Sequence, residues 1–298
     1  MKTGSIIVRG ARENNLKDVS VEIPKHQITV VTGVSGSGKS SLMECFRQTV
    51  EDRSEGVVYI SQKNIGVSLR STPATYMDVA PDIRKLFARQ HKLKEAYFTF
   101  NGKGACPVCG GKGVIVSEMA FMDNIETVCE ACGGLRYSPE ALQYKYEGMS
   151  IAQVMDLSVL RACRCFAGTV IEQKLRPLCD VGLGYLHLNQ ALSTLSGGEL
   201  QRLKLASHLA DEGSVFILDE PTDGLHLKDV SLLIGLIERL VDRGSTVYVI
   251  EHNTDVVRAA DYVVELGPGA GEQGGTILYT GEPRGLLSCS SSVTARYL

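Results

Sequence analysis

The 298-residue sequence lacks any run of about 18 apolar residues, which a membrane-spanning helix would require. Its first residues lead directly into a strand-like segment without the apolar core of a signal peptide, so we expect a cytoplasmic protein with no membrane partner. Positive charge is not in excess, because the formal net charge is -3. Any contact with nucleic acid must therefore come from a local patch. Tandem repeats and low-complexity tracts are also absent, which leaves an ordinary globular composition.

A glycine-rich segment, GVSGSGKS at residues 33–40, fits the phosphate-binding pattern G-x-x-x-x-G-K-[ST]. Glycines leave the backbone N–H groups accessible to a phosphate chain and permit positive φ. Lys39 would place its charge at the β- and γ-phosphates, and the Ser40 hydroxyl would ligate Mg²⁺. A predicted strand at 27–32 and a predicted helix at 40–50 flank the loop, which favours this interpretation over a chance match in a flexible loop. The predicted nucleotide-binding residues here are Gly33, Val34, Ser35, Gly36, Ser37, Gly38, Lys39, Ser40 and Ser41.

Other apolar segments frame this loop. Strand-like runs occur at residues 6–8, 19–23, 57–60, 215–218 and 247–250. The last two are continuously apolar, as in a parallel sheet that is covered on both faces. Apolar residues at helical spacing over 230–241 predict a helix that ends near Gly244. The Ser-rich tail 285–298 is expected to be loosely held.

The middle of the chain has a different character. From about residue 71, prolines and closely spaced cysteines accumulate, and residues 150–184 show helical apolar spacing that includes Val170 and Ile171. We interpret this region as an insertion in a nucleotide-binding fold. The predicted boundaries are 1–70 and 191–298 for the two parts of the core and 71–190 for the insertion, with a cysteine module at about 98–137.

Two acids, Asp219 and Glu220, follow the predicted strand at 215–218. An apolar strand that delivers two carboxylates beside a phosphate loop is the Walker B arrangement. Asp219 would support Mg²⁺, directly or through water, and Glu220 would orient and polarise the attacking water. The alternative is a solvated strand end without a catalytic role.

A second candidate anion site begins at Ser196, where Ser-Gly-Gly opens a predicted helix. The stretch 195–199, Leu-Ser-Gly-Gly-Glu, resembles the signature of ATP-binding-cassette (ABC) ATPases. That resemblance implies that Ser196, Gly197, Gly198 and Glu199 contact ATP held by another cassette. It also implies that Gln62 links Mg²⁺ and water to the inserted domain and that His252 contacts the γ-phosphate. Without the resemblance, a lone histidine is more often a satisfied buried group.

The chain has one phosphate loop and one signature, and therefore two half-sites. Two chains placed head to tail would complete two ATP sites. The sequence thus predicts an ATP-dependent homodimer, or a heterodimer with a second half of the same kind.

Four cysteines form two C-x-x-C pairs, at Cys106 and Cys109 and at Cys129 and Cys132. Tetrahedral Zn²⁺ takes four thiolates, and each pair supplies two from a glycine-rich knuckle. A redox role is the weaker alternative, because one such pair would suffice for it. The other five cysteines lack suitable partners in sequence.

Basic residues cluster beside this module. Residues 84–112 contain seven of them, Arg84, Lys85, Arg89, Lys92, Lys94, Lys103 and Lys112, against the single acid Glu95. The interleaved rings are Phe87, His91, Tyr97, Phe98 and Phe100. Cations for phosphates and rings for stacking suit nucleic acid. The alternative is a solvated helix face with core aromatics.

The whole pattern resembles the UvrA branch of the ABC ATPases, specifically its C-terminal half. The residues that carry the resemblance are 9–17, 33–40, 70–76, 98–101, the cysteine pairs, 136–137, 194–199, 220–226, 251–253, 266–268 and 294–298. His226 supports it, because transporter cassettes usually have aspartate there. Asp223 departs from it, because threonine or serine is usual.

The resemblance implies an α/β, ABC-type P-loop nucleotide-binding fold with an inserted helical, zinc-binding signature domain. It also implies an ATPase that uses ATP, Mg²⁺ and Zn²⁺, binds double-stranded DNA and recognises damage in nucleotide excision repair, or a stand-alone relative. Recruitment of UvrB stays open, because the segment for it belongs to the first half of UvrA. The alternatives are the ATP-binding subunit of a drug-resistance ABC transporter and a truncated fragment that only binds ATP.

Overall fold

The computed structural model describes residues 4–53, 56–61, 71–117, 125–209 and 213–298. The chain divides into two compact units, which are described separately. We call Met1–Ile65 with Ser196–Leu298 the sheet unit and Gly66–Leu195 the inserted unit. None of the helices in the described ranges is both long and apolar enough to cross a membrane.

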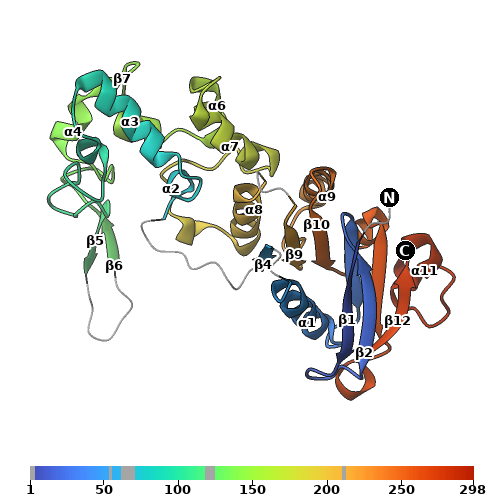
Figure 1. The fold of residues 1–298 in the computed structure, drawn as a ribbon. Helices are drawn as coiled ribbons and strands as arrows, with labels where there is room; N and C mark the ends of the chain where they lie inside the picture. Colours follow the sequence, from blue (N-terminus) through green and yellow to red (C-terminus); the bar gives the residue numbers. More distant parts are fainter. Residues whose placement is uncertain (1–3, 54–55, 62–70, 118–124, 210–212) are drawn as a thin grey trace. The chain divides into compact units, whose positions relative to one another are not determined.

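The sheet unit is built on a six-stranded sheet with the order β12-β11-β3-β10-β9-β4 (Figure 1). Its β-strands are β3 (Ile28–Gly33), β4 (Val57–Ile60), β9 (Val215–Asp219), β10 (Thr246–Ile250), β11 (Tyr262–Gly267) and β12 (Thr276–Gly281). All neighbours are parallel except β12, which is antiparallel to β11. Strands β3, β9 and β10 are buried almost throughout, because helices cover both faces of a parallel sheet.

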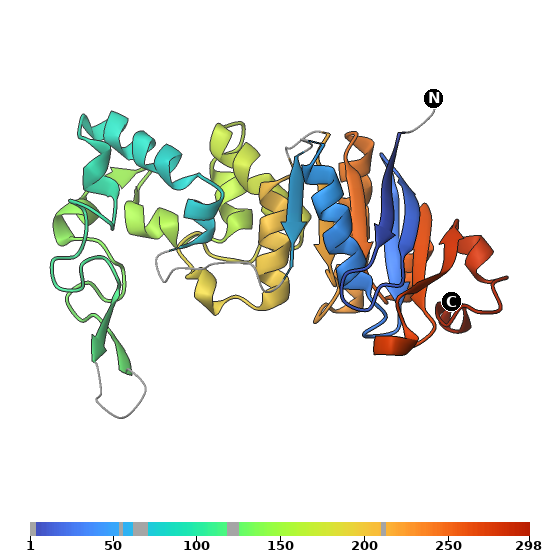
Figure 2. The same cartoon turned by 60° about the horizontal axis from the view of Figure 1, so that its bottom comes forward.

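One face of the sheet is covered by α1 (Lys39–Glu51) and by the antiparallel pair β1 (Ser5–Ala11) and β2 (Val19–Pro24), as Figure 2 shows. Phe46 of α1 is fully buried and packs edge-on against Tyr248 of β10, with ring centroids 4.0 Å apart. Helix α9 (Leu227–Asp242) buries a separate apolar stripe that includes Leu233 and Ile237. The remaining elements of the unit are α8 (Gly197–Ser207), α10 (Thr254–Ala259), η4 (Gly271–Gln273), α11 (Pro283–Leu286) and η5 (Thr294–Tyr297).

The inserted unit is mostly helical, with short two-stranded sheets. Its helices are α2 (Pro73–Tyr76), α3 (Ala80–His91), η2 (Glu95–Phe98), α4 (Pro139–Gln143), α5 (Ile151–Met155), α6 (Val159–Cys165), α7 (Val170–Asp180) and η3 (Leu192–Thr194). Its strands pair as β5 (Val114–Ser117) with β6 (Ile125–Val128) and β7 (Lys145–Tyr146) with β8 (Met149–Ser150). The α/β fold with a helical insertion is therefore as the sequence predicted.

Two local expectations are wrong. Val170 was assigned to the apolar face of a helix but is 51% exposed, because α7 begins there and turns Ile171 inward instead. The tail 285–298 is not loosely held. The buried carboxylate of Glu265 accepts hydrogen bonds from the N–H of Val293 (3.0 Å) and from the N–H and hydroxyl of Thr294 (2.8 and 2.7 Å). A long-range polar contact thus fixes a segment whose own composition suggests a loop.

Replacement of Phe46 by alanine tests the packing of α1 on the sheet. Loss of a fully buried aromatic ring is expected to lower the free energy of unfolding by about 3–5 kcal/mol. Urea denaturation followed by circular dichroism measures it. Leu232→Ala is the control, because that α9 side chain is 46% exposed and its loss is expected to change the free energy by no more than about 0.5 kcal/mol. Equal effects of the two substitutions would contradict this account of the core.

Candidate functional site: a phosphate loop, two acids and a cysteine cluster

The phosphate loop, residues 33–40, leaves β3 and enters α1. Gly33 has φ +133°, and a Cβ there would lie 2.0 Å from the carbonyl oxygen of Leu266. Gly36 and Gly38 also have positive φ, of +75° and +107°. Only glycine satisfies both the backbone conformation and the close approach at Gly33, so the sequence pattern is a direct requirement of this loop's geometry.

Lys39 is buried at the start of α1. Its ammonium group donates hydrogen bonds to the carbonyl oxygens of Gly33 (2.9 Å) and Val34 (3.0 Å). Burial lowers the pKa of Lys39, while the negative charges of Glu220 and Asp219 act in the opposite direction. The lysine charge therefore lies within the loop and within electrostatic reach of both acids predicted to act with it.

Two asparagines form hydrogen bonds with the phosphate loop and the start of α1, and neither is among the nucleotide-binding residues predicted from the sequence. The side-chain amide of Asn15 donates to the carbonyl oxygens of Gly36 (2.9 Å) and Gly271 (3.2 Å). The amide of Asn14 donates to the hydroxyl of Ser41 (3.0 Å). The sequence signals only a turn at these positions, because their partners lie far along the chain.

Asp219 is the last residue of β9, and Glu220 follows it. The Asp219 carboxylate accepts a hydrogen bond from the Tyr59 hydroxyl (3.0 Å), and its backbone carbonyl accepts one from the amide of Gln201 (3.0 Å). Burial, together with Asp219, raises the pKa of Tyr59, which therefore stays a donor. Glu220 is exposed, has φ +46° and donates its N–H to the carbonyl oxygen of Ile250 (3.0 Å). The hydrogen bond to β10 thus holds Glu220 in the left-handed conformation, which non-glycine residues adopt infrequently.

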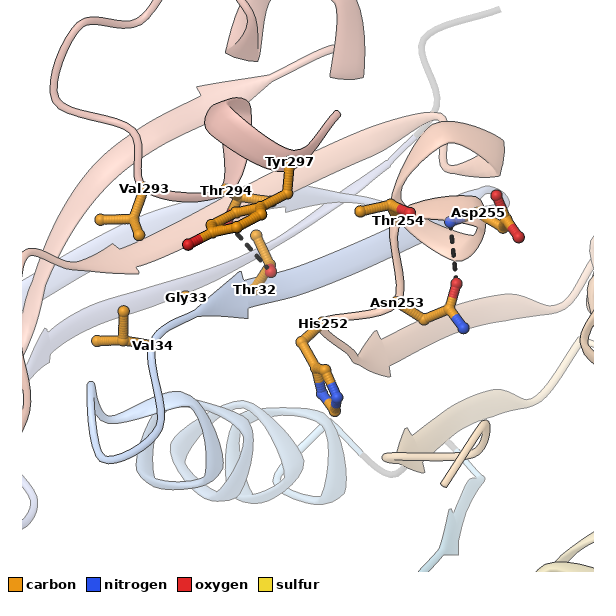
Figure 3. Close-up of a pocket in the computed structure, with 10 residues that line it drawn as sticks. All are labelled: Thr32, Gly33, Val34, His252, Asn253, Thr254, Asp255, Val293, Thr294 and Tyr297. Carbon is orange, nitrogen blue, oxygen red and sulfur yellow. Dashed lines mark hydrogen bonds between the residues drawn. The ribbon is translucent and has the colours of Figure 1, made fainter. Parts of the chain in front are cut away.

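His252 follows β10 and borders a cavity of about 510 Å³ beside the loop (Figure 3). The lining residues are Thr32, Gly33, Val34, His252, Asn253, Thr254, Asp255, Val293, Thr294 and Tyr297. The imidazole is 70% exposed, so it is available to a ligand rather than committed to the core. Gln62, the third predicted catalytic residue, lies outside the described residues.

The predicted signature caps α8. The Ser196 hydroxyl accepts from the N–H of Glu199 (3.3 Å), and the Glu199 carboxylate accepts from the N–H of Ser196 (2.7 Å). This capping box fixes the first turn of the helix. At Gly198 a Cβ would lie 3.3 Å from the Leu225 side chain, so the helix start packs closely on the loop after Glu220. Because the capping box uses the N–H groups of Ser196 and Glu199, an anion at this helix N-terminus would be bound by the N–H groups of Gly197 and Gly198.

The four paired cysteines converge in the inserted unit. All four are buried, and their sulfur atoms lie within 4.8 Å of one another. The Sγ atoms of Cys106 and Cys129 are 4.0 Å apart, and those of Cys109 and Cys132 are 3.7 Å apart. Tetrahedral zinc with Zn–S bonds of about 2.3 Å places sulfur atoms about 3.8 Å apart. The donor set therefore fits Zn²⁺ in both chemistry and spacing.

The two knuckles of this cluster have the same backbone. Gly110 and Gly111 have φ of +58° and +80°, and Gly133 and Gly134 have +56° and +81°. Burial alone raises the pKa of Cys109, but the N–H of Gly113, at 3.2 Å from its sulfur, and the neighbouring thiols lower it to about 7. A thiolate enclosed among three other sulfurs favours a bound cation.

In the basic stretch 84–112, six of the seven basic residues are exposed, whereas three of the five rings are buried. Lys85, Arg89 and Lys94 line a hollow of about 570 Å³ with Ala88, Leu93 and Glu95. The prediction that the aromatics are available for base stacking is wrong for three of them, since Phe87, Phe98 and Phe100 are buried. Phe87 of α3 and Phe98 of η2 pack together with centroids 5.3 Å apart, and Phe100 packs edge-on against Tyr137.

Comparison with known proteins agrees with this geometry. A family model described as ABC transporter matches residues 16–223. UvrABC system protein A of Staphylococcus aureus (strain COL) is 45% identical over 323 aligned positions, which cover 98% of this chain and 34% of that protein. The same protein of Staphylococcus epidermidis is 43% identical over the same coverage. The chain thus spans about a third of the length of the curated relatives it matches.

A solved structure extends the likeness to three dimensions. The crystal structure of UvrA2 from Deinococcus radiodurans superimposes with a TM-score of 0.92 at 39% identity, over 100% of this chain and 39% of that one. The resemblance to UvrA-like ABC ATPases noted from the sequence is confirmed by these comparisons. From the family match and the phosphate loop together, the chain belongs to the ATP-binding cassette family and is UvrA-like within it.

Proposed function

We propose that the chain binds and hydrolyses ATP as part of a UvrA-like protein that acts on DNA in nucleotide excision repair. The observation that carries this proposal is the parallel register of β3, β10 and β9, which brings the glycine loop with Lys39, the acids Asp219 and Glu220, and His252 to one end of the sheet. The 45% identity to UvrABC system protein A over 98% of the chain supports the assignment to repair rather than to a drug transporter.

Each residue of the nucleotide site has a proposed role. Backbone N–H groups of residues 33–40 and the Lys39 ammonium bind the phosphates. The Ser40 hydroxyl and the Asp219 carboxylate offer the oxygen ligands that Mg²⁺ prefers, and the bound ion would neutralise charge that develops on the phosphates. Glu220 accepts the proton of the attacking water, and His252 contacts the γ-phosphate.

The signature at 196–199 serves a second copy. A helix N-terminus without a basic side chain is suited to close over a phosphate that is already held by another loop. Two copies, or this chain and a second UvrA-like half, would then enclose two ATP molecules.

Glu220→Gln is expected to trap that dimer, because the variant binds ATP but cannot accept the proton of the water. With ATP and Mg²⁺, light scattering should report about twice the mass seen without nucleotide. Lys39→Ala in the same background is the matched control and should stay monomeric. A Glu220→Gln variant that is monomeric under both conditions would refute the head-to-tail arrangement.

The cysteine cluster is proposed to hold one structural Zn²⁺. Such a site contributes about 10–16 kcal/mol of apparent binding free energy in zinc-finger peptides, enough to determine local folding. The likeness of the two knuckles and the sulfur spacing support a closed four-thiolate site rather than a redox pair.

Metal analysis tests the cluster. The intact chain should carry about one zinc per molecule, and Cys129→Ser should lose it and expose the segment around residues 106–132 to protease. Cys165→Ser is the control, because that thiol is exposed on α6 and outside the cluster. Stoichiometric zinc in the Cys129→Ser variant would rule out the assigned ligands.

We further propose that the hollow lined by Lys85, Arg89 and Lys94 contacts the phosphates of double-stranded DNA. Three exposed cations around one concave surface provide phosphate contacts without reading sequence. Three of the five neighbouring rings, Phe87, Phe98 and Phe100, are buried, so charge is the main feature that this surface offers to a duplex whose bases stay stacked.

Salt dependence gives the clearest measure of this contact. Alanine at any one of the three positions should lower the magnitude of the slope by about 1, where the slope is that of the logarithm of the DNA association constant against the logarithm of the salt concentration. Fluorescence anisotropy with a labelled duplex measures the slope. Arg284→Ala removes an exposed cation of α11 and should leave it unchanged. Equal slopes for all four variants would place the DNA elsewhere.

A further inference from the structure

A buried glutamate, Glu251, accepts hydrogen bonds from both loops that carry the proposed catalytic side chains. Glu251 follows β10, directly before His252, and is completely inaccessible to solvent. It lies outside the predicted site residues. A buried carboxylate without hydrogen bonds would be strongly unfavourable, so Glu251 must be paired within the protein.

Each oxygen of Glu251 bonds to a different loop. Oε1 accepts from the backbone N–H of Thr222 (2.9 Å) and from its hydroxyl (2.5 Å). Oε2 accepts from the backbone N–H groups of His252 (2.8 Å) and Asn253 (2.9 Å). One carboxylate therefore holds the loop after Glu220 on one side and the loop of His252 on the other.

The backbone places this carboxylate at the sheet edge where both loops begin. The N–H of Glu251 donates to the carbonyl oxygen of Val31 in β3 (3.1 Å), and the N–H of Glu220 donates to that of Ile250 in β10 (3.0 Å). Glu220 itself has φ +46°, a conformation that persists only when its surroundings determine it. The four bonds to Glu251 are part of those surroundings.

We propose that Glu251 is a positioning residue, which sets the spacing between Glu220 and His252 so that both face one γ-phosphate. The inference rests on the proposed ATPase function and assigns no direct contact between Glu251 and nucleotide. Its effect should appear in turnover rather than in nucleotide binding, because the phosphate loop and Lys39 do not bond to it.

The alternative is that Glu251 only stabilises the fold, and the chain supplies a control for that. A second buried glutamate, Glu265, does not match it, because Oε1 alone accepts its three hydrogen bonds and its partner Thr294 lines the cavity beside His252. Leu233 of α9 is buried and lies outside both catalytic loops. Leu233→Ala therefore removes stability from a place that positions no proposed catalytic group.

The main variant is Glu251→Gln, which keeps the volume but presents an NH₂ group to the N–H donors of one loop. ATP turnover by phosphate release and nucleotide affinity by fluorescent-ATP titration are measured on the full chain. We expect kcat to fall about 100-fold, as for an approximately 1 Å misplacement of reacting groups, with KM and Kd changed less than about threefold. Leu233→Ala should lower the melting temperature at least as much but keep kcat within about threefold of the unaltered chain.

Thr222→Val is the second variant and serves if Glu251→Gln does not fold. It removes one hydroxyl donor at nearly constant volume and leaves the backbone N–H bond, so kcat should fall about tenfold, the effect of losing about 1.4 kcal/mol in the transition state.

The outcomes separate the two proposals. Full turnover by Glu251→Gln or by Thr222→Val overturns this inference alone, as does an equal loss of turnover in Leu233→Ala. Absence of turnover by the unaltered chain, at concentrations where it dimerises, overturns the proposed ATPase function and this inference with it.

Discussion

The parallel pairing of β10 with its two neighbours is the constraint on which the nucleotide site depends. In this register Ile250 lies opposite Val31 of β3 and opposite Asp219 of β9. Strands β9 and β10 therefore end at one level and β3 continues two residues further, so the phosphate loop, the acid pair and the histidine leave the sheet at the same edge. A shift of one residue in either pairing would turn alternate side chains to the other face and separate these groups.

Much of this arrangement is predictable from sequence because its determinants are local. The phosphate-loop pattern, the apolar runs of β3, β9 and β10 and the capping box of α8 can each be recognised within a short stretch of sequence, although the close approach of Leu266 that requires glycine at Gly33 is long-range. The predicted helix at 40–50 begins and ends within one residue of α1. The two cysteine knuckles are equally local, since each repeats the same turn with the same pair of glycines.

The features that escape prediction are long-range polar contacts. Asn15 forms hydrogen bonds with Gly36 and Gly271, and Glu265 forms one with Thr294. These partners are too far apart in the sequence for a local pattern to predict them. Strand β11 is also difficult to recognise from the sequence, because the buried acidic residue Glu265 interrupts its apolar run. Among the cysteines without sequence partners, the sulfurs of Cys163 and Cys179 lie 3.9 Å apart, since α6 and α7 pack side by side in the inserted unit. The expectation that Phe87, Phe98 and Phe100 are available for base stacking fails for another reason. A unit that contains a basic helix still needs apolar side chains for its core, and these three rings are buried in it.

The attachment of the C-terminal segment by Glu265 has a practical consequence for handling the protein. Val293, Thr294 and Tyr297 line the same cavity as Val34 and His252 (Figure 3). The carbonyl oxygen of Leu298 accepts a hydrogen bond from Arg258. A group attached to residues 293–297 would lie at that cavity and compete with whatever enters it. Fluorophores for kinetic work are therefore better attached outside this segment.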